Sequence, residues 1–209
     1  GDSIDKELMI AMRAANFDSL MFGIETASDK LMALINKKET VQENIDAVKL
    51  AKEMGFTVEA TFIYGFPTET FDDRFKAFAL SLEIEIDRAR FNNATPYPGT
   101  EMYNMVKEKL DIEPGWVNFS SAGAVTAGIW RKYLLPYVPE GCTTNELEGT
   151  VLLANLLFYL NLSNLKKLFN PQQGGSGKWF EVPKGKLFSL NVLFDLTLLA
   201  GTVLIRTIR

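Results

Sequence analysis

The sequence contains no histidine and only one cysteine, Cys142, among its 209 residues. Without histidine, the chain lacks the commonest general base and the commonest metal-ligating side chain. One cysteine cannot form an intramolecular disulfide, which favours a reducing, cytoplasmic compartment. Lys and Arg form no long basic run and the formal net charge is −4, so nucleic acid is not expected as a partner. The polar, acidic N-terminus shows no signal peptide.

Short, mostly apolar runs alternate with helical patterns in the first half of the chain. With short connections, this order is typical of βαβ units in a parallel sheet. The first two runs are apolar enough to predict strands buried on both faces, while the third alternates more. Strands are expected at 19–25, 57–65 and 86–95, and helices at 4–15, 40–54, 70–82 and 99–110.

The helix starts carry recognisable signals. Thr40 with Glu43 forms a capping box at the clearest helix of the chain. Asp72 and Asp73 are interpreted as acids in the first turn of the helix at 70–82. Glu69 stands at the same helix start, and cap or dipole chemistry is favoured there over contact with a ligand.

The composition changes after residue 110. Residues 1–110 are expected to form the βα domain, and 111–169 an aromatic loop with a helix that starts at the Thr143–Glu146 capping box. A Gly/Ser/Gln linker is expected at 170–186. Residues 187–209 predict an amphipathic apolar helix with Asp195 on its polar stripe, which favours packing on protein over contact with a membrane surface.

The three predicted strands end in "GIETAS", "YGFPTET" and "ATPYPGT". Parallel strands present ligands at their carboxyl ends, and each of these ends combines a Gly or Pro turn with hydroxyl groups. None has the G-x-G-x-x-G or Walker spacing of a phosphate loop. Glu25 closes a buried strand, where a carboxylate costs several kcal/mol unless something binds it. A site for a polar, nucleoside-like ligand is therefore expected, with Glu25 in it.

Together the segments "FGIETASDKLMALINKKET", "ATFIYGFPTET" and "FNNATPYPGTEMY" resemble the C-terminal half of the radical S-adenosylmethionine (radical SAM) barrel. The closest resemblance is to the cobalamin-binding-domain subgroup that includes anaerobic magnesium-protoporphyrin ester cyclase. It implies an α/β fold: half of a partial (β/α)6 barrel with three parallel βα units, followed by a mostly helical C-terminal extension.

The resemblance also implies roles for particular residues. Glu25 matches the position whose carboxylate binds the ribose or amino-acid part of the nucleoside. "TFIYGFPTE" resembles the motif G-x-I-x-G-x-x-E, with Thr61 in place of its first glycine and one more residue before its glutamate. Ile63 would pack beside the adenine and Gly65 would allow the chain to approach closely, while Thr95 to Pro98 would border the adenine and the substrate. The expected cofactor-binding residues are Glu25, Thr26, Ile63, Gly65, Thr95 and Pro96.

The family's C-x-x-x-C-x-x-C motif, whose thiolates hold a [4Fe–4S] cluster, is absent. SAM is therefore the cofactor expected at this chain, whereas the cluster and cobalamin are expected in the parent enzyme with ligands from elsewhere. Neither catalytic residues nor metal ligands are predicted here, and Cys142 is expected to be inert.

Two functions follow as hypotheses. The first is a C-terminal fragment of a radical SAM enzyme that acts on a small organic substrate, completed by an N-terminal half in the same or a separate chain. The alternative is a non-catalytic binding or scaffold module that pairs with a cluster-bearing chain. A complete (β/α)8 enzyme would need eight units, and three are found. Either way, the edge of strand 19–25 and an apolar inner face are expected to promote association.

Overall fold

The computed structural model describes residues 5–110, 120–121 and 135–161. The predicted linker at 170–186 and the predicted helix at 187–209 lie outside these residues, as does most of the aromatic segment. In the described part, none of the helices is long and apolar enough to cross a membrane.

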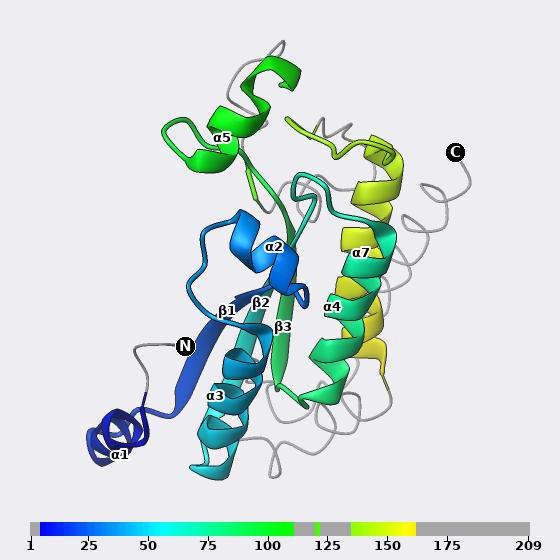
Figure 1. Ribbon diagram of the computed structural model, residues 1–209. Coiled ribbons are helices and arrows are strands. Elements are labelled where there is room, and N and C mark those ends of the chain that lie inside the picture. Colours follow the sequence, from blue (N-terminus) through cyan, green and yellow to red (C-terminus); the bar gives the residue numbers. More distant parts are fainter. Residues whose placement is uncertain (1–4, 111–119, 122–134, 162–209) are drawn as a thin grey trace.

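Three parallel strands form one sheet in the order β1-β2-β3 (Figure 1). They are β1 (Ser19–Glu25), β2 (Thr57–Tyr64) and β3 (Arg88–Asn93). Each predicted strand is confirmed, the third being shorter at both ends. Since neighbouring strands are parallel and consecutive, each connection must cross over, as in a βαβ unit.

The helices are α1 (Lys6–Ala14), α2 (Asp29–Leu34), α3 (Val41–Glu53), α4 (Phe71–Glu83), α5 (Glu101–Val106) and α7 (Thr144–Leu160). A 3₁₀ turn, η1 (Lys107–Lys109), follows α5, so the helix predicted to 110 is shorter than expected. The sequence pattern did not predict α2, because six residues are too few to show a helical period. The capping box of Thr40 and Glu43 at α3 is confirmed.

Helices α3, α4 and α7 pack on one face of the sheet (Figure 1). Alternate strand residues point into this core, which holds Leu20, Phe22, Ile24, Val58, Ala60, Phe62, Tyr64, Ala89 and Phe91. Phe62 stacks on Phe91 with ring centroids 5.1 Å apart. Full burial of such a side chain contributes about 1.5–3 kcal/mol, so this layer stabilises the sheet.

The opposite, inner face of the sheet differs from expectation at β1, whereas no residue of β2 is exposed on either face. β1 is buried on one face only: Leu20 and Phe22 are buried, whereas Ser19 and Met21, which point to the other face, are exposed. Polar and charged residues occupy most of the inner face: Glu59, Thr61, Arg88, Arg90 and Asn92. Arg90 Nε lies 2.6 Å from Glu59 Oε1. The expected apolar inner face is therefore wrong; Met21, 62% exposed, and Ile63 are the apolar residues on it.

The two edges of the sheet differ in how their backbone groups are covered. At the β3 edge, Asn155 of α7 accepts a hydrogen bond from Phe91 N (3.2 Å) and donates one to Phe91 O (2.8 Å). Tyr159 of α7 donates to Ala89 O at 2.9 Å. Helix α7 thus satisfies backbone groups that a fourth strand would otherwise pair with.

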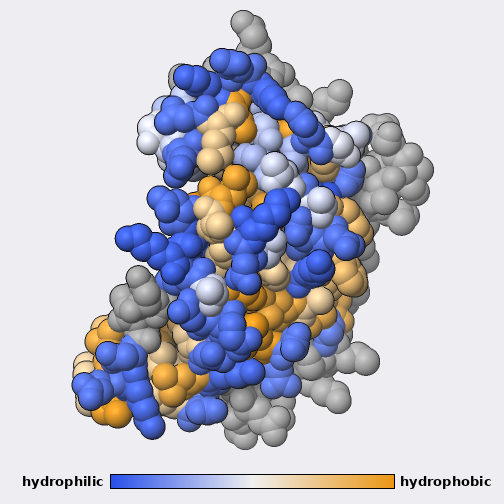
Figure 2. Space-filling view, viewed as in Figure 1, coloured by the Kyte–Doolittle hydropathy of each residue, from blue (hydrophilic) through white to orange (hydrophobic). Residues whose placement is uncertain are grey.

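The β1 edge lies near a group of exposed apolar side chains. Leu8, Ile10, Phe17 and Met21 are 43–62% exposed. Figure 2 shows apolar side chains gathered over α1, at the lower left of the view. The association expected along β1 stays a prediction, and this surface is where it would take place.

Candidate functional site

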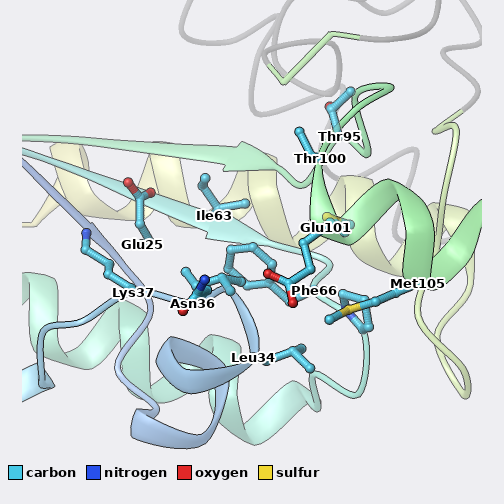
Figure 3. A pocket seen from close by; sticks show the side chains of 13 residues that line it. Glu25, Leu34, Asn36, Lys37, Ile63, Phe66, Thr95, Thr100, Glu101 and Met105 are labelled. Carbon is cyan, nitrogen blue, oxygen red and sulfur yellow. The ribbon is translucent and has the colours of Figure 1, made fainter.

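A pocket of about 470 Å³ lies beyond the carboxyl ends of the strands, in the range of small-molecule sites (Figure 3). The strand ends, the segment after α2, the β2–α4 turn and helix α5 form its walls. Its lining residues are Glu25, Leu34, Ile35, Asn36, Lys37, Ile63, Phe66, Pro67, Thr95, Thr100, Glu101, Met102 and Met105.

Glu25 has an unusual backbone conformation at the end of β1. The register between β1 and β2 shifts between Gly23 and Glu25, and Glu25 has φ +67°. A side-chain-bearing residue in this left-handed region costs roughly 1–2 kcal/mol. The carboxylate folds back over Gly23, where an added Cβ would lie 2.4 Å from Glu25 Oε1. The missing side chain at position 23 makes room for this carboxylate.

Lys37 is the cation nearest to this feature. Its ammonium donates to the Gly23 carbonyl and lies 3.9 Å from a carboxylate oxygen of Glu39. Figure 3 shows Lys37 and Glu25 along the same end of the pocket. Burial raises the pKa of Glu25, while Lys37 and the Thr61 hydroxyl act against that shift. The pocket therefore holds a carboxylate and an ammonium close together.

Two buried polar atoms at this strand end have no hydrogen-bond partner: Glu25 Oε2 and Thr26 Oγ1. Buried polar atoms are nearly always paired, since an unmade hydrogen bond costs about 1–3 kcal/mol. The Glu25 oxygen belongs to a residue that lines the pocket, so a ligand hydroxyl or amine could satisfy it.

Apolar side chains form another part of the lining. Ile63 projects from β2, Phe66 from the turn after it, and Leu34 from the end of α2 (Figure 3). Met102 and Met105 contribute polarisable thioethers from α5. Such a surface suits a flat heterocycle, with polar groups at one end to orient it.

The structure brings together three of the six predicted site residues. Glu25, Ile63 and Thr95 line the pocket, whereas Thr26, Gly65 and Pro96 are buried and do not line it. Sequence reasoning did not predict Asn36, Lys37 or the α5 residues. The Ser28–Asp29 helix start was the only local signal for α2, which places Asn36 and Lys37 at the pocket.

Gly65 has φ +98°, and the space beside it is taken by helix α7. A Cβ at this position would lie 2.8 Å from Leu147 Cδ2. In this structure the glycine permits the close packing of α7 against the end of β2. The approach to a ligand that the resemblance implies at Gly65 stays a prediction.

Glu69 does not cap the helix, which corrects the interpretation from sequence. Thr70 is the N-cap of α4, with Asp73 completing a capping box, and Asp72 and Asp73 lie in the first turn as expected. Glu69 is buried and its carboxylate accepts a hydrogen bond from Gly65 N–H. Arg74 Nη1 lies 3.6 Å from the same carboxylate. Burial raises the pKa of Glu69 to about 7, against the opposing effects of Gly65 and Arg74.

Cys142 lies just before α7 and is partly buried. Burial is the largest influence on its thiol and raises the pKa, which fits the inert role expected from the sequence. Among the residues described, no three Cys, Asp or Glu side chains are grouped closely enough to hold a metal ion.

Comparison with known proteins finds a family match for the first part of the chain. Residues 1–80 match the radical SAM superfamily. The chain is 33% identical over 125 residues to a protein named as an uncharacterized methyltransferase of Pyrococcus horikoshii, which covers 59% of this chain and 27% of that protein. It is 27% identical over 173 residues to anaerobic magnesium-protoporphyrin IX monomethyl ester cyclase of Cereibacter sphaeroides, covering 83% of this chain and 26% of the relative.

Among solved structures, the Elp3 protein of Methanocaldococcus infernus aligns with a TM-score of 0.47 at 19% identity, over 50% of this chain and 25% of that chain. The chain spans about a quarter of the length of the relatives it matches. The resemblance to radical SAM proteins, and to the ester cyclase among them, is confirmed.

Proposed function

We propose that this chain, whose residues 1–80 match the radical SAM superfamily, supplies the SAM-binding strand ends of a radical SAM enzyme. One observation carries the proposal: the buried, unpaired oxygen of Glu25, held over Gly23 in a strained conformation at a pocket that Ile63 and Thr95 also line. Backbone strain of this kind is concentrated at functional sites.

Each residue has a definite part in the proposed complex. The Glu25 carboxylate accepts hydrogen bonds from ribose hydroxyls of SAM, and Lys37 beside it opposes the upward shift that burial imposes on its pKa. Ile63 and Phe66 pack against the adenine, and the Thr95 hydroxyl borders the ring. In this superfamily, bound SAM is the source of a 5′-deoxyadenosyl radical.

The iron–sulfur cluster does not fit the residues of this chain. A [4Fe–4S] cluster of this family needs three thiolates from the protein, and the sequence has Cys142 alone. The cluster ligands must come from protein outside these 209 residues. No step is assigned to this chain beyond binding and orienting SAM, and no described residue argues for or against cobalamin.

For the whole enzyme we propose radical methylation, cyclisation or C–H functionalisation of a small organic substrate. The names of the methyltransferase and ester cyclase relatives support this range. A partner that carries the N-terminal half of the barrel would complete the site.

The alternative function is a non-catalytic binding module that pairs with a separate cluster-bearing chain. The single cysteine favours it. The genomic sequence ahead of the Gly1 codon separates the two: an in-frame C-x-x-x-C-x-x-C supports one enzyme, and a stop codon followed by an independent start supports a separate module.

Isothermal titration calorimetry with SAM tests the proposed binding site. Wild type is expected to bind, and Glu25→Gln to bind about 10-fold or more weakly, because hydrogen bonds to a charged group contribute about 1.5–3 kcal/mol. Glu53→Gln, an exposed substitution of the same type on α3, serves as the control and should match wild type. Equal affinities for wild type and Glu25→Gln would refute the assignment.

A further inference from the structure

The turn that follows β2 presents two pocket residues, Phe66 and Pro67. Two hydrogen bonds close this turn. Gly65 N–H donates to the Glu69 carboxylate, and Glu69 N–H donates to Phe66 O at 3.0 Å. Thr68 within it has φ +65°, a conformation that requires support from its surroundings. The position of Phe66 and Pro67 thus depends on where the Glu69 carboxylate is held.

Arg74 holds that carboxylate from behind. Its side chain is 1% exposed, and its Nη1 lies 3.6 Å from Glu69 Oε2. Its backbone carbonyl accepts a hydrogen bond from the Tyr64 hydroxyl at 3.1 Å, which ties the start of α4 to the end of β2. A buried guanidinium needs compensating charge, since an unpaired one costs several kcal/mol.

The second partner of Arg74 comes from a distant part of the chain. Glu146, in the first turn of α7, lies 2.7 Å from Arg74 Nη2, and the two residues are 72 positions apart. The next residue of α7, Leu147, fills the space beside Gly65. Consecutive residues of α7 therefore reach the turn in two ways, Leu147 at Gly65 itself and Glu146 through Arg74.

We propose that Arg74 and Glu146 are positioning residues for the nucleoside site, through which helix α7 sets the place of the turn that carries Phe66 and Pro67. This inference rests on the proposed function, because it assigns the turn to the adenine side of the SAM site. Neither residue lines the pocket. Their effect on the ligand passes through Glu69 and the Gly65 amide.

The first experiment is direct and needs no ligand. The Gly65 amide resonance in an 15N–1H spectrum reports its hydrogen bond to the Glu69 carboxylate. Glu146→Gln should move this resonance upfield and speed its hydrogen exchange. Glu140→Gln is the matched control, because Glu140 is exposed, precedes α7 and pairs with Lys109 instead. A Gly65 resonance that does not change in Glu146→Gln would overturn the proposal.

The second experiment measures SAM affinity of the same variants by calorimetry. Glu146→Gln is expected to weaken binding by about fivefold or more, the lower end of typical coupling between sites, while Glu140→Gln remains like wild type. A change in unfolding midpoint with unchanged SAM affinity would show a merely structural ion pair and overturn the proposal. If wild type itself does not bind SAM, the proposed function fails, and the Gly65 resonance still tests the link from α7 to the turn.

A rescue variant separates positioning from misfolding. Arg74→Met alone leaves Glu69 buried without its counter-charge and should unfold the chain or loosen the turn. The double variant Arg74→Met, Glu69→Gln removes both charges and keeps an amide oxygen to accept from Gly65 N–H. It should recover the fold but not the wild-type Gly65 resonance, because its link to α7 is still broken. A wild-type Gly65 resonance in the folded double variant would contradict the proposed role of the ion pair.

Discussion

Gly23→Ala is a sharp test of the site, because it perturbs the Glu25 carboxylate without touching its chemistry. An added Cβ would lie 2.4 Å from Glu25 Oε1, below the 3.0 Å that real Cβ contacts almost never undercut. The nearest atoms that the added Cβ would meet belong to side chains, and the closest of them, Glu25 Oε1, ends a side chain that can rotate. The carboxylate should therefore swing out of its place over residue 23, while the strand keeps its pairing with β2.

The magnitude follows from the interaction that is lost. Hydrogen bonds to a charged group contribute about 1.5–3 kcal/mol, which corresponds to a roughly 10- to 150-fold weaker dissociation constant for SAM. The free energy of unfolding should change far less. A Gly-to-Ala change at a tolerated backbone position stabilises by about 0.4–1 kcal/mol through the unfolded state, which offsets part of the cost of moving Glu25.

The assay combines calorimetry with SAM and chemical denaturation on Gly23→Ala, with Gly149→Ala as the matched control. A Cβ at Gly149, inside α7, meets no atom within 4 Å. This control should gain about 0.5–1 kcal/mol in helix stability and bind SAM like wild type. Wild-type affinity in Gly23→Ala would refute the argument that the folded-back carboxylate is the ligand-binding group.

Four further predictions concern the charge of Glu25, the β3 edge of the sheet, the iron–sulfur cluster and self-association of the chain. Burial raises the pKa of Glu25, so the contribution of this carboxyl group to stability is fully present below pH 4.5 and is lost as pH rises through the folded-state pKa. Glu25→Gln should therefore be more stable than wild type in urea denaturation at pH 7. Equal stability of the two proteins would contradict this. Asn155→Ala should lower the free energy of unfolding by about 1–3 kcal/mol, since it leaves both backbone groups of Phe91 unpaired; a loss near zero would mean that water replaces Asn155. Anaerobic reconstitution should yield no stoichiometric [4Fe–4S] cluster on a chain whose one thiol is Cys142, and near four irons per monomer would disprove it. The chain should associate in size-exclusion chromatography and Met21→Lys should reduce that association, whereas a monomeric wild type would show that the β1 edge is already protected.

The sequence by itself determined the three strands, most of the helices and their order. The apolar runs at β1, β2 and β3 and the Thr40 capping box act over a few residues, so they can be recognised locally. Alternation of strands with helices then requires a parallel sheet, and a parallel sheet brings the strand ends to one edge. Glu25 follows from that reasoning and Ile63 and Thr95 from the resemblance to the radical SAM barrel, and the structure places all three at one pocket.

Only the tertiary structure decided which side chains line the pocket and what supports them. The Glu25 carboxylate takes its place because Gly23 leaves room, and Lys37 reaches it only through α2, which is too short to show in the pattern. Arg74 meets Glu146 across 72 residues. Contacts of this kind depend on how the elements pack in space, and no local preference of the chain encodes them.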